Sequence, residues 1–338
     1  MSLRLSILDQ SPVISGHTSA EALAQTVQLA RTAEALGYHR YWLAEHHALA
    51  ALADPCPEIL LARVASATTR IRVGTGGVLL PYYSALKVAE IFRMLEALFP
   101  DRIDLGIGRA PGGDLATAQA LSNGQYQAAD HFAEQVQDLV GYLDDALPPG
   151  HAYARVKATP AGPSSPPIWL LGSSDYSGAL AAALGLRFAF AHFISARGGD
   201  LVTRAYRERF QPSAREAKPH AVVCAFVICA ETAVEAERLA ASIDLRRLHM
   251  AQGADTPIPA TAEALAYAYA PHERDYVQQQ RARTIIGAPA QVHERLLKLR
   301  DAFDADELMI LTITGDYESR IRSYELLARE LNLSKSNE

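Results

Sequence analysis

Side chains that could carry out chemistry gather in one short stretch of the sequence, Glu45, His46 and His47. They directly follow residues 41–44, an apolar segment typical of a buried strand. A carboxylate and two imidazoles can accept, donate or transfer a proton near neutral pH. They can equally be hydrogen-bonded packing groups at the rim of a fold. Metal binding is not predicted, because neighbouring strand residues point to opposite faces and the four-residue spacing of a zinc-binding histidine pair is absent.

Two glycines interrupt the next apolar segment, residues 71–80. Gly76 and Gly77 have no side chains, so a flat or bulky group could approach the backbone there. A simple β-bulge would explain them as well.

An anion site is indicated by residues that follow two later apolar segments. Arg109 comes soon after residues 102–107, and its guanidinium could clamp a phosphate or carboxylate, although a loop salt bridge is the alternative. Ser173, Ser174 and Ser177 stand at the start of a predicted helix, where they could bind an anion or act as ordinary caps. One phosphate could be held by both groups.

These candidates need a scaffold that brings the ends of several strands together. Apolar strand-like segments alternate with amphipathic helical segments along the chain, which predicts a parallel (β/α)8 barrel with right-handed crossovers. The predicted strands are residues 3–8, 39–44, 71–80, 102–107, 167–171, 187–193, 220–230 and 307–313.

The active site of such a barrel lies at the carboxyl ends of its strands. We therefore expect a polar ring above an apolar barrel. Its members are Asp9, Gln10, Glu45, His46, His47, Gly76, Gly77, Gly108, Arg109, Gly172, Ser173, Ser174 and His192.

The barrel is predicted to be a single domain over residues 1–333, with insertions after strands four and seven. The second insertion, residues 251–283, loses the helical pattern and contains several prolines. A segment of this length in a compact fold is more often a lid or binding loop than a plain connection. Residues 334–338 are predicted to form a disordered tail.

Composition excludes several classes of protein. The 338 residues are 49% hydrophobic and 21% charged, as in an ordinary globular protein and unlike disordered or collagen-like chains. A net charge of -6 gives no general attraction to nucleic acid or anionic membranes. No apolar run reaches membrane-spanning length and no signal peptide is evident, so a cytoplasmic protein is expected.

Four ordered motifs resemble those of the bacterial luciferase-like flavin-dependent monooxygenases. The resemblance extends over nearly the whole chain, including two further short matches near the C-terminus. The motifs are residues 41–47, 73–81, 101–109 and 169–177, and the further matches are residues 286–289 and 305–308.

The resemblance implies roles for the first two groups of residues. His46 matches the active-site histidine beside the flavin, flanked by Glu45 and His47, and is predicted to be catalytic. Gly76 and Gly77 match the site of a cis peptide bond against which the isoalloxazine ring packs. Glu45 and the two glycines are therefore predicted to belong to the cofactor site.

The resemblance also assigns the phosphate end of the cofactor. Arg109, Ser174 and Ser177 match groups around the FMN phosphate, and Ser173 stands where the luciferase catalytic chain carries a glutamate. Gly108 stands where that chain has a reactive cysteine, so light emission is not expected.

The activity implied by the resemblance is that of a two-component monooxygenase. Reduced FMN, a dissociable cosubstrate delivered by a separate NAD(P)H:flavin reductase, would react with O₂ and oxidise a small organic substrate. The family further implies a homodimer built on the second and third barrel helices. It places a mobile loop at residues 251–283, which would act as a lid.

Three alternatives remain open. The same barrel could use the deazaflavin F420 for hydride transfer, or bind flavin without catalysis. A barrel hydrolase would need Glu45 and Asp9 as its acid and base. The substrate is expected to be apolar or aromatic, because the aromatic residues predicted to line its pocket are Tyr82, Tyr83, Tyr126 and Phe193.

Overall fold

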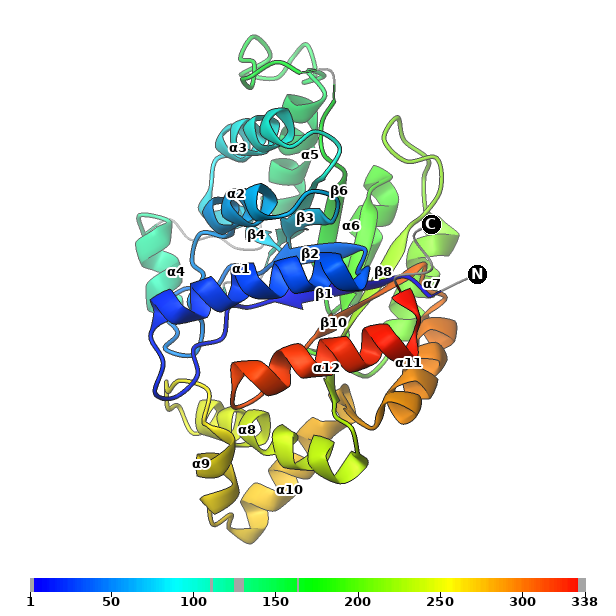
Figure 1. Cartoon of the computed structure of the whole chain (residues 1–338). Coiled ribbons are helices and arrows are strands. Elements are labelled where there is room, and N and C mark those ends of the chain that lie inside the picture. The colour runs from blue at the N-terminus through cyan, green and yellow to red at the C-terminus, as the bar shows by residue number, and fades with distance from the viewer. Residues whose placement is uncertain (1–2, 110–111, 125–130, 163, 334–338) are drawn as a thin grey trace.

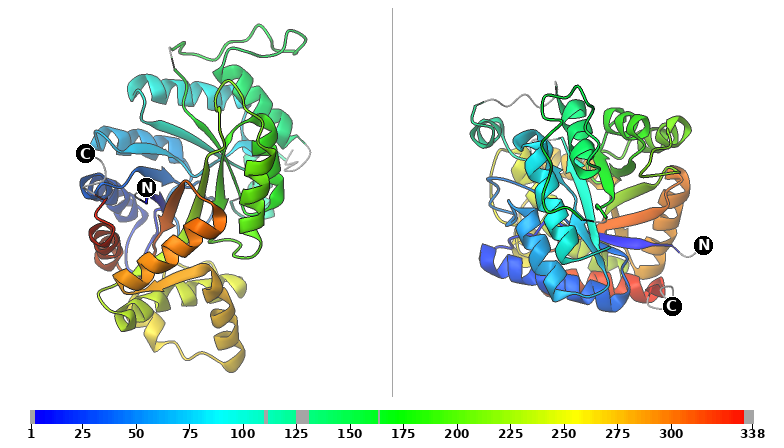
Figure 2. Two further views of the ribbon diagram at one scale, coloured as in Figure 1. Left: turned by 90° about the vertical axis from the view of Figure 1, so that its right-hand side faces the viewer. Right: turned by 90° about the horizontal axis from the view of Figure 1, so that it is seen from above.

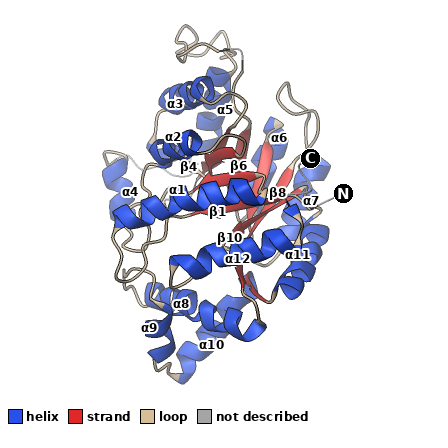
Figure 3. Ribbon diagram, in the orientation of Figure 1, coloured by secondary structure: helices blue, strands red, loops and turns tan. Residues whose placement is uncertain are grey.

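The computed structural model describes residues 3–109, 112–124, 131–162 and 164–333. Eight parallel strands form a closed barrel at its centre, because β10 pairs with both β1 and β8 (Figures 1 and 3). The predicted (β/α)8 barrel is confirmed. The predicted tail and Tyr126 lie outside the described residues. The barrel strands are β1 Leu5–Asp9, β2 Arg40–Leu43, β3 Arg72–Thr75, β5 Ile103–Gly108, β6 Ile168–Gly172, β7 Arg187–Ala191, β8 Ala221–Cys229 and β10 Glu307–Leu311.

Strand residues alternate between two apolar cores, as the period of two requires. Ile7 and Tyr41 are paired across β1 and β2 and point outward, into the layer between the barrel and its helices. Leu8, Trp42 and Met309 point into the barrel. All of the strands run in parallel, so their carboxyl ends open on one side of the molecule.

Helices surround the strands, as Figure 2 shows. Local sequence sets the bounds of α1, since the Thr18 hydroxyl accepts the Glu21 N–H at 3.2 Å and Gly37 ends the helix at φ 85°. Within the described residues, every helix is too short or too polar to span a bilayer. The surrounding helices are α1 Ser19–Leu36, α2 Pro57–Ala67, α3 Ala85–Leu98, α5 Phe132–Leu143, α6 Asp175–Leu184, α7 Gly199–Arg209, α11 Pro289–Phe303 and α12 Tyr317–Glu330.

The connections contain further elements, and two of them, α4 and β9, were not predicted. β9 pairs in parallel with the outer half of the long strand β8, so that Phe226 lies opposite Thr284. Four residues are too few for an alternating pattern to reveal such a strand. The further elements are β4 Val78–Leu79, η1 Leu80–Tyr82, α4 Leu115–Leu121, α8 Ala233–Ala251, α9 Thr261–Ala266, α10 Pro271–Gln280, η2 Arg281–Arg283 and β9 Thr284–Gly287.

The segment 251–283 forms short helices beside α8 and projects from one side of the barrel (Figure 1). Its first part is tied to the loop after β1, because the Ile258 N–H donates to the Val13 carbonyl and its carbonyl accepts the Ser15 N–H, both at 2.8 Å. Its far end is tied to α8 by the Arg281–Asp244 ion pair, at 2.6 Å. The segment is therefore docked at both ends.

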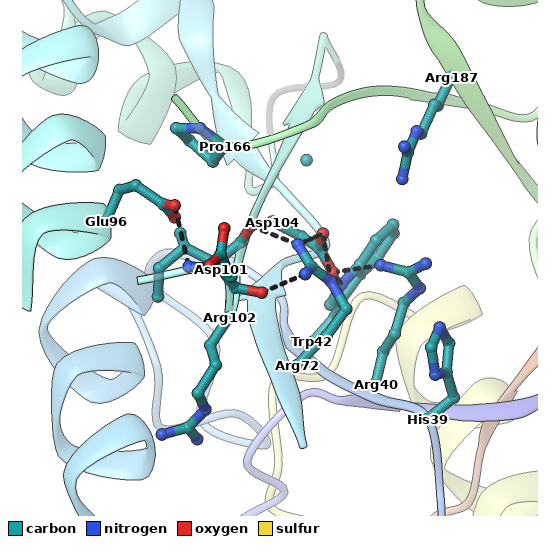
Figure 4. Close-up of polar contacts among 12 residues, drawn as sticks. His39, Arg40, Trp42, Arg72, Glu96, Asp101, Arg102, Asp104, Pro166 and Arg187 are labelled. Carbon is teal, nitrogen blue, oxygen red and sulfur yellow. Dashed lines mark hydrogen bonds and ion pairs between the residues drawn. The ribbon is translucent and has the colours of Figure 1, made fainter. Parts of the chain in front are cut away.

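A buried charge network closes the amino end of the barrel (Figure 4). Arg40 is 3% exposed and bonds Asp104 Oδ2 at 2.7 Å and Glu307 Oε2 at 3.0 Å, while Arg72 bonds Asp104 Oδ1 at 2.8 Å. Burial opposes ionisation of Asp104, but the two guanidinium groups prevail and lower its pKa to about 2. Asp104 also accepts the indole N–H of Trp42 at 3.1 Å, which fixes that ring above the network.

Candidate active site

A cavity of about 240 Å³ opens at the carboxyl ends of the strands. All eight residues predicted from the sequence as site residues lie in its lining, although they come from four separate parts of the chain. Their roles in catalysis and cofactor binding stay predictions. These residues are Glu45, His46, Gly76, Gly77, Arg109, Ser173, Ser174 and Ser177.

Glu45 is held rigidly where β2 meets its loop. One carboxylate oxygen contacts His47 Nε2 and accepts the Tyr83 hydroxyl, each at 2.7 Å. The other accepts the Leu79 N–H at 2.9 Å. Glu45 is 3% exposed, so these bonds replace the water it loses on burial. Its carboxylate therefore ties the loop after β2 to β4 and η1.

The two histidines face different surroundings. His47 bonds Glu45 and packs edge-on against Tyr82, with 6.0 Å between the ring centroids. His46 lines the cavity, and within the described structure its buried Nδ1 has no hydrogen-bond partner. Burial lowers the pKa of His46 to about 4, so the imidazole is neutral at pH 7. It can thus donate or accept a hydrogen bond, and it carries no charge into the cavity.

Gly76 and Gly77 join β3 to β4 through a cis peptide bond, as the resemblance implied. A side chain at position 77 would meet backbone atoms, and one at position 76 would meet the end of a leucine side chain. A Cβ on Gly76 would lie 2.6 Å from Leu8 Cδ1, and one on Gly77 would lie 2.6 Å from the Gly106 carbonyl oxygen. The Gly106 backbone therefore requires glycine at position 77, and both glycines present bare backbone to the cavity.

The anion end of the cavity combines Arg109 with the start of α6. Ser174 is the N-cap residue of α6, yet its side chain makes no cap hydrogen bond. Ser177 is 4% exposed and lies one turn further along the helix. No described oxygen accepts a hydrogen bond from the Arg109 guanidinium, whose Cζ lies 4.2 Å from the centre of the Tyr176 ring. Hydroxyls, a helix N-terminus and a cation with free donors suit a phosphate.

The other residues that line the cavity are mostly apolar, and the buried charge network at the amino end of the barrel supports them. Trp42 lines the floor, where Asp104 holds its indole ring. Met309 and Cys224 line the cavity as well, and burial raises the pKa of the Cys224 thiol, which keeps it protonated. The sequence interpretation gave Asp104 no role, because the partners of a buried charge cannot be seen in its own segment.

Some residues expected around the cavity are elsewhere. Phe193 lines it, but Tyr82 and Tyr83 do not, since Tyr83 is bonded to Glu45 and Tyr82 packs on His47. His192 is also absent from the described lining and packs edge-on against Phe303 in α11.

Asp9 is likewise turned away from the cavity. Its carboxylate is fully buried and bonds Arg320 at 2.6 Å, the Tyr41 hydroxyl and the Ser11 N–H. The hydrolase alternative needed Asp9 as the second carboxylate beside Glu45. Because Asp9 is sequestered in this ion pair, that interpretation is wrong.

Comparison with known proteins identifies the family. The model of the luciferase-like monooxygenases matches residues 3–306 of the chain. The chain belongs to this family.

Its relatives include proteins with monooxygenase names. A luciferase-like monooxygenase of Escherichia coli K12 is 39% identical, with 96% of each chain covered. The N-acetyl-S-alkylcysteine monooxygenase of Bacillus subtilis is 37% identical over 96% of this chain and 97% of its own. A more distant match is the oxygenase component of the flavin-dependent trigonelline monooxygenase of Acinetobacter baylyi, 25% identical over 45% of this chain and 44% of its own.

Several solved structures have a similar fold. Apo-MsnO8 has a TM-score of 0.90 and 40% identity, with 98% of each chain covered. The oxygenating constituent of Pseudomonas putida 3,6-diketocamphane monooxygenase, in complex with FMN, has a TM-score of 0.69, 18% identity and 98% coverage of each chain. An F420-dependent secondary alcohol dehydrogenase has a TM-score of 0.68 and 12% identity, covering 98% of this chain and 99% of its own. The last two likenesses concern the fold alone.

In this luciferase-like barrel, the segment 251–283 contributes no residue to the described lining. Its closest link to the cavity is Arg283, which donates to the Ile194 carbonyl at 3.0 Å in the loop after β7. Ile194 itself lines the cavity. The segment thus supports one wall from behind, and its function as a lid stays a prediction.

Proposed function

We propose that this protein is a flavin-dependent monooxygenase that uses reduced FMN and O₂ to oxidise a small organic substrate. The proposal rests mainly on the residues that line the cavity. One end offers a guanidinium and a helix N-terminus to an anion, and the remainder is apolar around one neutral imidazole. The monooxygenase names of two close relatives support this reaction class.

The residues of the cavity fit FMN. Arg109, Ser173, Ser174 and Ser177 would bind the phosphate, because all four line the same cavity and the guanidinium is unpaired within the described structure. The bare backbone of Gly76 and Gly77 would lie against the flat ring system. When bound, reduced FMN supplies the chemistry that activates O₂, and the protein orients the reactants and limits water.

His46 would act on the reacting atoms as a neutral group. Its imidazole can donate a hydrogen bond to an oxygen atom or hold a proton between reactants, and burial keeps it uncharged beforehand. Glu45 positions the backbone of this loop through its bonds to His47, Tyr83 and Leu79. Glu45 therefore acts on the cofactor through the shape of the loop.

The substrate is proposed to be largely apolar. Phe193, Ile194 and Met309 are among the apolar residues that line the cavity. Arg109 is the only Lys or Arg in the described lining, so no second cation is available for an acidic substrate group deep in the cavity. A thioether without a carboxylate is the first class to test, since one relative is named for a substrate with a thioether group, N-acetyl-S-alkylcysteine.

A separate NAD(P)H:flavin reductase is proposed to supply reduced FMN, which would bind as a dissociable cosubstrate. The proposal is supported by the relative named as the oxygenase component of a flavin-dependent monooxygenase. We also propose a homodimer formed by α2 and α3. Ile59 on α2 is 69% exposed, and Met94 and Leu98 on α3 are 58% and 56% exposed.

The test combines binding with turnover. The purified protein is titrated with reduced FMN and with F420, and is then incubated with a flavin reductase, NADH, FMN, O₂ and a panel of thioethers. We expect reduced FMN to bind more tightly and the product to contain one atom from ¹⁸O₂. Oxidation that requires F420 and proceeds without O₂ would support the F420 alternative. Tight FMN binding without any product from a broad panel would support a non-catalytic flavin-binding protein.

A further inference from the structure

Arg109 has an unusual environment for a cavity arginine. Neither a carboxylate nor a carbonyl oxygen of the described residues accepts a hydrogen bond from its guanidinium. An arginine side chain without such partners samples many rotamers, and ordering it on ligand binding has an entropic cost. A contact other than an ion pair would be needed to hold Arg109 at the cavity.

The Tyr176 ring supplies that contact. The Arg109 Cζ lies 4.2 Å from the ring centroid, within the range of a cation–π interaction. A guanidinium stacked by its face keeps its N–H donors free, since they lie in its own plane. A carboxylate partner would instead occupy two of those donors and neutralise the charge.

The position of Tyr176 links this contact to the anion end of the cavity. Tyr176 is the second residue of α6, directly after Ser174 and Asp175. Asp175 is close in sequence and could compete for the guanidinium, yet no ion pair joins it to Arg109 in the described structure. The aromatic ring thus holds the cation next to the helix N-terminus without neutralising it.

We propose that Tyr176 is a positioning residue that holds Arg109 ready to bind the phosphate of the cofactor. The inference rests on the proposed function, because it takes the anion to be the phosphate of reduced FMN. Tyr176 would raise affinity for the phosphate alone, and contacts to the flavin ring would be unaffected. Tyr176 is 36% exposed, so its replacement is not expected to unfold the protein.

The test compares reduced FMN with reduced riboflavin, which has the same ring but no phosphate. Dissociation constants are measured for the full chain by anaerobic equilibrium dialysis. We expect the wild type to bind reduced FMN at least about tenfold more tightly than riboflavin, as charge-assisted phosphate contacts require. Tyr176→Leu should weaken FMN binding about three- to tenfold and leave riboflavin binding unchanged.

Three controls make the inference specific. Tyr176→Phe keeps the ring and should bind like the wild type, and Tyr153→Leu removes a 60% exposed tyrosine outside the described lining and should have no effect. In an Arg109→Met background, Tyr176→Leu should cause no further loss of FMN affinity.

Specific outcomes would overturn the inference. They are an equal loss for FMN and riboflavin in Tyr176→Leu, a persistent loss in the Arg109→Met background, or no loss at all. If instead the wild type binds FMN no more tightly than riboflavin, the proposed FMN site is wrong and the inference falls with it. The ratio of the wild-type dissociation constants for riboflavin and FMN therefore distinguishes a wrong FMN site from a wrong role for Tyr176.

Discussion

His46 and His47 are adjacent in the sequence, but their surroundings give them different chemistry. His47 is bonded to Glu45 and contributes to the shape of the loop. His46 lines the cavity, and burial keeps its imidazole neutral. A neutral imidazole in an apolar cavity can form a hydrogen bond with a ligand. Two predictions therefore concern His46.

Replacing His46 by Ala should lower turnover about 100-fold or more, since a positioned acid or base commonly contributes that much. Binding of reduced FMN should change far less. Turnover is measured with saturating reduced FMN and the substrate found in the product screen. His47→Gln serves as the neighbouring control and should lose less turnover than His46→Ala. Unchanged turnover in His46→Ala would remove this residue from the reaction.

The ionisation of His46 is predicted to occur well below its usual range. Burial favours the neutral form and lowers its pKa to about 4, so protonation begins only as the pH falls toward that value. The His46 ring signals in an NMR titration, assigned by their absence in His46→Asn, should stay constant from pH 8 to about pH 5.5. A midpoint near pH 6.5 for these signals would contradict this environment.

At the scale of elements, the carboxyl and amino ends of the barrel strands contribute to different parts of the structure. The amino ends of β2, β3, β5 and β10 supply the charges of the floor network, while the carboxyl ends supply the cavity. Asp104 connects the two, since it accepts bonds from Arg40, Arg72 and the indole of Trp42. The floor therefore supports the shape of the cavity.

Asp104→Asn should lower the free energy of unfolding by about 3–5 kcal/mol, because it leaves the buried Arg40 and the half-buried Arg72 without their shared carboxylate. Urea unfolding monitored by circular dichroism measures the change. Asp275→Asn replaces an exposed carboxylate with no bond among the described contacts, and should alter the same quantity by less than about 0.5 kcal/mol. A loss below about 1 kcal/mol in Asp104→Asn would show that the network contributes little.

The difference between wild type and Asp104→Asn should depend on pH. The pKa of Asp104 is lowered to about 2 in the folded protein, whereas an unfolded aspartate has a pKa of about 3.9. The stabilising contribution is thus complete above about pH 4 and is lost as the pH falls toward 2. Repeating the urea unfolding at pH 5.5 and pH 3 should give a smaller difference at the lower pH.

At the scale of the whole molecule, exposed apolar residues on α2 and α3 are expected to bury each other in a dimer. Ile59→Asp combined with Met94→Asp should convert the dimer into a monomer, because the interface would have to bury two charges. Size-exclusion chromatography with light scattering measures the mass. Val234→Asp, at an 81% exposed position on α8, should leave the dimer intact. A monomeric wild type at micromolar concentration would rule this interface out.

Much of the fold was predictable because its signals are local. Alternation of apolar residues marked the barrel strands, and a glycine such as Gly37 marked the end of a helix. Parallel strands put their carboxyl ends on one side, so the placement of His46, Gly76 and Arg109 around one cavity could be predicted as well. β9 was missed because four residues carry too little periodic signal.

The sequence by itself thus determined the barrel and the set of strand ends that meet above it. Only the tertiary structure decided which of those side chains face the cavity. Asp9 forms an ion pair with Arg320, 311 positions away. Tyr83 donates a hydrogen bond to Glu45, 38 positions away. A buried polar group turns toward whichever partner replaces its lost water, and partners this distant leave no local pattern in the chain.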